Sequence, residues 1–138
     1  MSEVVADSCV AAKWVVAESD SSKAQALLAE AARRGERMTI LELAFAEVGN
    51  VLWKHQRSGM ITAGEAKSLW EKFNGLPLTI VPIHHVLDRA LEIAIAYDRS
   101  VYDAAFVAAV EKRRARGVTS DAKLHRAVAG DFPAIELL

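Results

Sequence analysis

Short runs of β-branched residues alternate with longer segments of helical periodicity along this chain. When a strand is followed by a helix and then by another strand, the two strands almost always lie parallel, with the helix packed on one face of their sheet. The pattern therefore predicts an α/β fold, a three-layer α/β/α sandwich with a central, mainly parallel sheet. The expected strands are residues 4–6, 78–81, 117–119 and 134–138, with 38–40 as a shorter candidate.

Seven further segments have the apolar spacing or the end signals of helices. Ser22 and Thr62 are each followed three residues later by Gln or Glu, which is the sequence of a capping box. The segment that begins at Val101 is apolar nearly all round, so we expect it to be almost fully buried. The strand at 78–81 has the apolar run of a buried parallel strand. The expected helices are residues 10–16, 22–34, 41–57, 62–74, 86–97, 101–110 and 121–128.

The charge balance excludes a protein held on nucleic acid or membrane by its overall field. Lys and Arg number 17 against 18 Asp and Glu, a net charge of -1, so a polyanion site must be local. A hydrophobic content of 52% excludes disorder, and 138 residues suit one domain, 1–138. No segment has the roughly 18 uninterrupted apolar residues of a membrane span. The lone Cys9 has no disulfide partner, so we expect a reducing, cytoplasmic location.

Four acidic residues stand where parallel α/β folds place their ligands, beyond the carboxyl ends of the strands. Asp7 directly follows the first strand, and Asp121 follows the strand at 117–119 across one serine. Asp103 lies in the first turn of the apolar helix, where a charge facing the protein is costly unless it is paired or bound to metal. Glu47 lies on the flank of an apolar helical face, on one stripe with Asn50 and Lys54.

Each of these acids also has an ordinary structural interpretation. Asp7 and Asp121 suit helix N-caps, Asp103 complements a helix dipole, and Glu47 could pair with Lys54. The functional interpretation depends on all four lying together. Carboxylates at one sheet edge repel one another unless a cation joins them, and Mg²⁺ or Mn²⁺ is the ion that suits oxygen ligands and water. Such a site supports in-line attack on a phosphodiester, which is nuclease chemistry.

Four motifs, in order, resemble the PIN domain family, in its VapC-like toxin ribonuclease form. They are VVADSCVAAKWVV, LELAFAEVGNVLWK, SVYDAAFVAAVEKR and VTSDAKLHRAV. The resemblance implies a metal-dependent endoribonuclease of a toxin–antitoxin pair that uses Mg²⁺, with Mn²⁺ as the alternative, is inhibited by a cognate antitoxin and forms a homodimer. By matching position, Asp7, Glu47, Asp103 and Asp121 are the catalytic and metal-binding residues, and Ser8, Asn50 and Thr119 support them. Only Val118 precedes the Thr-x-Asp motif where the family has two or three apolar residues, so we expect a shortened strand there.

Other residues suggest where partners bind. Basic residues at Lys112, Arg113, Arg114 and Arg116, with Lys123 and Arg126 beyond them, could bind RNA phosphates or complement a helix dipole, and both interpretations stay open. Trp14, Trp53 and Trp70 suit a dimer or antitoxin interface better than base stacking.

Two other function classes share parts of this pattern. One is a PIN-fold module that binds RNA or protein without cleaving it, and the intact acids argue against it. The other is a receiver-like or flavodoxin-like module, which also has an acid at a strand end. The chain has no Gly-rich phosphate loop, and a receiver has no use for Asp103 and Glu47.

Overall fold

The computed structural model describes residues 2–138, and within this range the strands form one fully parallel sheet. Its order is β3-β2-β1-β4-β5, so the first strand of the sequence lies at the centre. The predicted α/β class and parallel sheet are confirmed. The strands are β1 (Glu3–Ala6), β2 (Arg37–Leu41), β3 (Thr79–Val81), β4 (Arg116–Thr119) and β5 (Ile135–Leu137).

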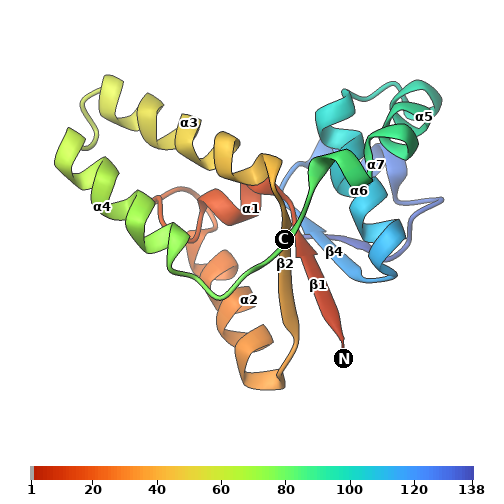
Figure 1. Ribbon diagram of the computed structural model, residues 1–138, viewed down its shortest axis with the longest axis horizontal. Helices are drawn as coiled ribbons and strands as arrows, with labels where there is room; N and C mark the ends of the chain where they lie inside the picture. Colours follow the sequence, from red (N-terminus) through yellow and green to blue (C-terminus); the bar gives the residue numbers. More distant parts are fainter. Residues whose placement is uncertain (1) are drawn as a thin grey trace.

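The helices cover both faces of this sheet and complete the predicted three layers (Figure 1). The first four pack on one face and the last three on the other, and α3 and α4 reach out beyond the sheet as a pair. Within residues 2–138 no helix is long and apolar enough to cross a membrane. The helices are α1 (Ser8–Ala12), α2 (Ser21–Arg34), α3 (Leu43–Arg57), α4 (Ala63–Asn74), α5 (Leu87–Tyr97), α6 (Val101–Arg113) and α7 (Ala122–Val128), with a 3-10 turn at Ile83–His85.

The central strand explains why the sheet needs both layers of helices. Val4 and Val5 are completely buried, and they point into different cores, one on each side of β1. Helix α6 fills the second core: every residue from 104 to 110 is buried, as its sequence predicted. Gly117 lets α6 approach β4, since a Cβ there would lie 2.5 Å from Val110 Cγ2.

Local signals fixed most helix ends, but not all. The capping box at Thr62 and Glu65 is present in full. The capping box predicted at Ser22 is wrong, because α2 begins at Ser21. The residue before it, Asp20, makes no capping hydrogen bond with its side chain, and Ser21 Oγ forms hydrogen bonds with the backbone of the preceding loop. Leu41 belongs to β2 rather than to a helix, since it pairs with Val81 of β3.

Two strand predictions also need correction. Strand β3 is an edge strand and not a buried one, and Ile80 at its centre is 48% exposed. Strand β4 is not shortened: at four residues it is as long as β1. Its first residues look unlike a strand in sequence because Arg116 carries ion pairs and Gly117 makes room for α6. Asp121 is therefore not displaced by a missing strand.

Candidate active site

Asp7 stands at the carboxyl end of the central strand, where β1 turns into α1. Its Oδ1 accepts a hydrogen bond from the backbone N–H of Ser8 at 2.9 Å and caps that short helix. Its Oδ2 accepts a hydrogen bond from Thr119 Oγ1 at 2.8 Å. Asp7 is thus both the predicted cap and a carboxylate fixed to the next strand of the sheet.

Thr119 joins the ends of β1 and β4. Its side chain is completely buried, and while its hydroxyl donates to Asp7, the same Oγ1 accepts from the backbone N–H of Asp121 at 3.1 Å. Asp121 Oδ1 in turn accepts from the N–H groups of Lys123 and Leu124 and caps α7. These bonds use Oδ1, and within residues 2–138 Asp121 Oδ2 makes no hydrogen bond.

The other two acids come from helices on opposite layers. Asp103 lies in the first turn of α6, after Ser100, whose Oγ caps the helix by accepting from the Asp103 N–H at 3.0 Å. Glu47 lies on α3 and shares the lining of a small pocket with Asp7 and Ser8. Since α3 and α6 both begin at the carboxyl ends of the strands, both acids reach the same edge as Asp7.

Electrostatic coupling shows that these acids share one field. Burial, with the charges of Glu47 and Asp103, raises the pKa of Asp7 to about 6, against the opposing hydrogen bonds from Thr119 and Ser8. Burial and then the charge of Asp103 raise the pKa of Glu47. Burial and then the charge of Asp121 raise the pKa of Asp103. The four acids thus lie along one edge of the sheet: Asp7 shares a pocket with Glu47 and is linked through Thr119 to the backbone of Asp121.

The four side chains are of the chemical type that binds a hard divalent cation. All four side chains offer carboxylate oxygens, the ligands that Mg²⁺ and Mn²⁺ prefer, and a cation would relieve their mutual repulsion. Within residues 2–138, however, no three Asp, Glu, His or Cys side chains are arranged so that they could hold a metal ion as they stand. The fit therefore rests on the chemistry of the donors and on their shared field.

The supporting residues divide between two places. Ser8 and Thr119 contact the acids directly, as described. Asn50 lies one turn beyond Glu47 on α3, in an adjoining groove of about 370 Å³ that Ser8 and Lys54 also line. The ion pair considered between Glu47 and Lys54 does not form, and Lys54 makes no ion pair within residues 2–138.

Three neighbours of the site were missed by the sequence analysis. Cys9 lies behind Asp7, with Sγ 3.5 Å from Thr119 Oγ1 and accepting from the Ser120 N–H at 3.3 Å, and burial raises the pKa of its thiol. Arg99 opposes the upward shift of the Asp103 pKa. Tyr102 lines the small pocket with Asp7 and Glu47 and is 67% exposed. Its place beside Asp103 in the motif was the available signal.

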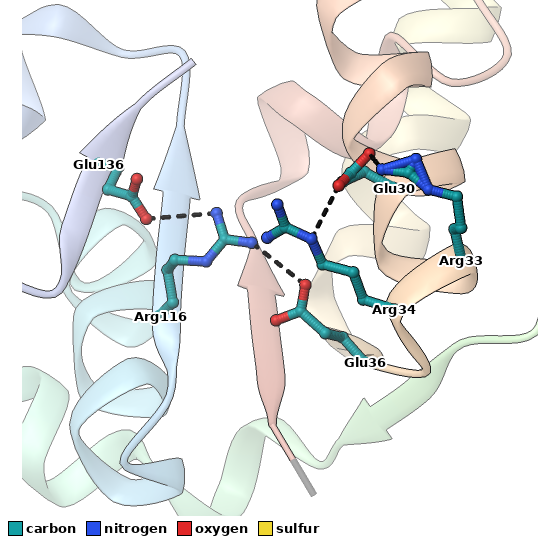
Figure 2. A network of polar contacts seen from close by, with 6 residues as sticks. All are labelled: Glu30, Arg33, Arg34, Glu36, Arg116 and Glu136. Carbon is teal, nitrogen blue, oxygen red and sulfur yellow. Dashed lines mark hydrogen bonds and ion pairs between the residues drawn. The ribbon is translucent and has the colours of Figure 1, made fainter.

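Of the predicted basic residues, Lys123 and Arg126 lie on α7, whereas Lys112, Arg113, Arg114 and Arg116 lie at the other end of α6. From Asp103 to Lys112 the helix rises by roughly 13 Å, so these residues meet the amino ends of the strands. There Arg113 pairs with Glu3 at 2.9 Å, and Arg116 lies 3.6 Å from Glu36 and 3.3 Å from Glu136 (Figure 2). Two of the predicted RNA-binding cations are therefore occupied by intramolecular ion pairs.

The three tryptophans serve different purposes. Trp14 is buried and donates from Nε1 to the Ala24 carbonyl at 3.0 Å, so its assignment to an interface was wrong. Trp53 is 50% exposed and Trp70 is 37% exposed, and both line an apolar groove of about 300 Å³ between α3 and α4. These two remain available to a partner.

Comparisons with known proteins agree with this fold. The model of the PIN domain family matches residues 4–130. Ribonuclease VapC3 of Pyrobaculum aerophilum is 34% identical over 137 residues, which cover 96% of this chain and 97% of that protein. Two solved structures share the fold at low identity. The Mycobacterium tuberculosis toxin VapC20, described as cleaving the sarcin–ricin loop, has a TM-score of 0.68 at 15% identity, with 90% of this chain and 94% of that one covered. A toxin–antitoxin complex from Klebsiella pneumoniae has a TM-score of 0.64 at 14% identity, with 96% of this chain and 95% of that one covered.

Proposed function

This chain belongs to the PIN domain family, as a relative of the VapC proteins, and on that premise we propose that it is a metal-dependent endoribonuclease. It hydrolyses RNA phosphodiester bonds in the cytoplasm as the toxin of a toxin–antitoxin pair, with residues 1–138 as one nuclease domain. The name of the 34% identical relative supports ribonuclease activity. The observation that carries the proposal is the placement of acids at one edge of a parallel sheet, where Asp7 shares a pocket with Glu47 and is linked to Asp121 through Thr119.

In this proposal Asp7, Glu47, Asp103 and Asp121 hold Mg²⁺, or Mn²⁺ in its place. The bound ion supplies an activated water and offsets the charge that develops on the phosphate. Thr119 fixes the orientation of Asp7 by donating to Oδ2, and the Ser8 N–H fixes the other carboxylate oxygen. The capping bonds of Asp121 and Ser100 hold Asp121 and Asp103 at the beginnings of α7 and α6.

The raised pKa values have a role in this arrangement. A carboxylate with a pKa of about 6 is held at a cost in its ionised form near neutral pH, so it gains more from a cation than an exposed Asp does. We therefore expect cleavage to fall at mildly acidic pH, where Asp7 takes up a proton and leaves the ligand set.

Cleavage by the purified chain tests the proposal. Partner-free protein is incubated with total RNA and with defined RNAs in Mg²⁺, in Mn²⁺ and in EDTA. We expect endonucleolytic products with either ion and none in EDTA. RNA that stays intact with both ions, from protein that is folded by circular dichroism, would instead favour the binding-module alternative.

We also propose that a small antitoxin protein inhibits this site and that the chain forms a homodimer. The toxin–antitoxin complex among the structural neighbours supports a protein partner, and the groove that bears Trp53 and Trp70 offers a partner apolar surface. On α5, Leu91 and Ile95 are 54% and 76% exposed, one turn apart, which suits a contact between copies.

Expression in cells tests the partner proposal. The chain alone should arrest growth, an Asp7→Asn variant should not, and a cognate antitoxin should restore growth. Unimpaired growth with abundant folded wild-type chain would contradict a toxin. Size-exclusion chromatography of wild type and of Ile95→Glu tests the dimer, which the added charge should dissociate.

A further inference from the structure

Two recesses meet at the acidic edge and share one wall. The small pocket that Asp7 and Tyr102 line, and the groove of about 370 Å³ that Asn50 and Lys54 line, have Ser8 and Glu47 in common. Tyr102 comes from α6 on one side of Glu47, whereas Lys54 lies further along α3 on the other. A chain laid across the acids would therefore meet Tyr102 at one end and Lys54 at the other.

Tyr102 is an aromatic side chain without a structural task. It is 67% exposed, and its hydroxyl makes no hydrogen bond within residues 2–138. The other tyrosine differs: Tyr97 packs against the Phe132 ring at 5.7 Å and donates to Asp131. An exposed ring beside an acidic pocket offers its face to a base, because every base has a π-face that can stack on it.

Lys54 is a cation in the wall of the groove beside Glu47. It is exposed, and none of the ion pairs in residues 2–138 involves it, whereas Arg113 and Arg116 are paired at the far end of the sheet. It lies seven residues after Glu47, about 10 Å along α3. Four acids repel a polyanion, so a free ammonium beside them suits a phosphate that flanks the one under attack.

We propose that Tyr102 and Lys54 bind a single-stranded segment of RNA on either side of the acids. The Tyr102 ring stacks on a base on the α6 side, and the Lys54 ammonium binds a backbone phosphate on the α3 side, with Asn50 in the same groove. This inference rests on the proposed ribonuclease function. It favours single-stranded RNA, because a base in a duplex must first be unpaired and unstacked, which costs free energy, before it can stack on a side chain.

RNA binding without cleavage tests these contacts. In an Asp7→Asn background, a short fluorescein-labelled single-stranded oligoribonucleotide of random sequence is titrated by fluorescence anisotropy in Mg²⁺, and a gel confirms that it stays intact. Tyr102→Ala should weaken binding about 5- to 150-fold, the range for loss of one stacked base. Tyr102→Phe should bind like the parent, because it keeps the ring. Met60→Ala is the matched control, because Met60 is apolar and, like Tyr102, 67% exposed.

Salt dependence separates the two residues. Lys54→Ala removes one phosphate contact, so the slope of log affinity against log salt should become shallower by about 0.7. Lys72→Ala, an exposed lysine on α4, and Tyr102→Ala should both leave the slope unchanged. A duplex of the same sequence should bind more weakly and show no loss in Tyr102→Ala.

The outcomes distinguish this inference from the proposed function. With Asp7 restored, both variants should raise KM for RNA cleavage and leave kcat nearly unchanged. If wild type cleaves RNA and neither variant changes affinity, salt slope or KM, the contacts proposed here are wrong and the nuclease stands. If wild type cleaves nothing while Tyr102→Ala and Lys54→Ala lose RNA binding, the contacts stand and the chain is an RNA-binding module. A chain that neither cleaves nor binds RNA would contradict both the nuclease proposal and the proposed RNA contacts.

Discussion

Both ends of the central sheet gather charged side chains, but the two ends satisfy them differently. At the amino ends of the strands, Glu3 meets Arg113, and Arg116 lies between Glu36 and Glu136 (Figure 2). Burial works to raise the pKa of Glu3, but the bonds from Arg113 and Thr39 and the charge of Arg113 bring it below its ordinary value. At the carboxyl ends the acids meet one another, and burial and mutual repulsion raise their pKa values.

The difference shows that two clusters of charged residues can have different roles, one in stability and the other in binding a ligand. At the amino edge, each ionised carboxylate is stabilised by an arginine, so the charges hold elements together. At the carboxyl edge, ionisation costs free energy that Arg99 and the hydrogen bonds to the acids offset only in part. Charges matched within the chain indicate structure, whereas charges left unmatched indicate a ligand.

Neutralising an acid at the carboxyl edge should have the largest effect, on catalysis. Asp7→Asn and Asp103→Asn should each lower the rate of RNA cleavage more than about 100-fold, since even outer-shell partners of metal sites reach that loss. Glu47→Gln should behave alike, and so should Asp121→Asn, because β4 is not shortened. Glu3→Gln is the matched control and should cleave normally. The measurement is the single-turnover rate, and equal rates in all of these variants would contradict the assignment.

The stability of Asp7→Asn should depend on pH in the direction set by repulsion. Folding raises the pKa of Asp7 from 3.8 to about 6, so the folded state binds the proton more tightly and the free energy of unfolding falls as pH rises through this window. At pH 7 in EDTA the variant should therefore be more stable than wild type, by up to roughly 3 kcal/mol.

Urea denaturation at pH 7 and near pH 4 measures this difference. The advantage of Asp7→Asn should disappear at the lower pH, where wild type also carries the proton. A variant that is less stable than wild type at pH 7 would show that Asp7 is an ordinary cap whose hydrogen bonds outweigh any repulsion.

Metal should stabilise the protein through the acids at the carboxyl edge and not through Glu3 at the amino edge, with a slightly smaller change in the free energy of unfolding. An ion that binds only the folded state at a hundredfold excess over Kd stabilises it by about 2.7 kcal/mol. Mn²⁺ should therefore raise the Tm of wild type by several degrees and that of Asp103→Asn much less, while Glu3→Gln shifts like wild type. Thermal melts in EDTA, Mg²⁺ and Mn²⁺ provide the comparison. Equal Tm shifts in all three proteins would show that the acids at the carboxyl edge do not bind the metal.

The smallest effect is expected at the amino edge, with the opposite dependence on pH. The lowered pKa of Glu3 contributes stability above its ordinary value of 4.5, and this is lost as pH falls through the folded-state pKa. Glu3→Gln should lose roughly 1 kcal/mol at pH 7, the cost of a weakened hydrogen bond. Its deficit should shrink below pH 4.5. A deficit that stays constant with pH would show that packing, and not charge, is what Glu3 supplies.

Local patterns predicted the element order because each pattern reports on its own segment. The Thr62 capping box, the buried α6 and the run at 4–6 all depend on neighbours in sequence, and all are found in the structure. Predictions failed where a distant partner decided the outcome. Leu41 belongs to a strand because Val81 pairs with it, and Arg116, outside the predicted strand, belongs to β4 because Val4 pairs with it.

The sequence alone determined that acids follow strands and begin helices, since residue types and spacing set those positions. Only the tertiary structure decided which charges meet. Parallel strands bring Asp7 and Asp121 to one edge, and the 13-residue helix α6 carries Asp103 there while its basic end reaches Glu3 at the other. Coulombic interactions depend on distance in space and on burial, neither of which follows from spacing along the chain. For that reason the sequence showed four acids and six bases, and the fold determined that the acids face one another while Arg113 and Arg116 already have partners.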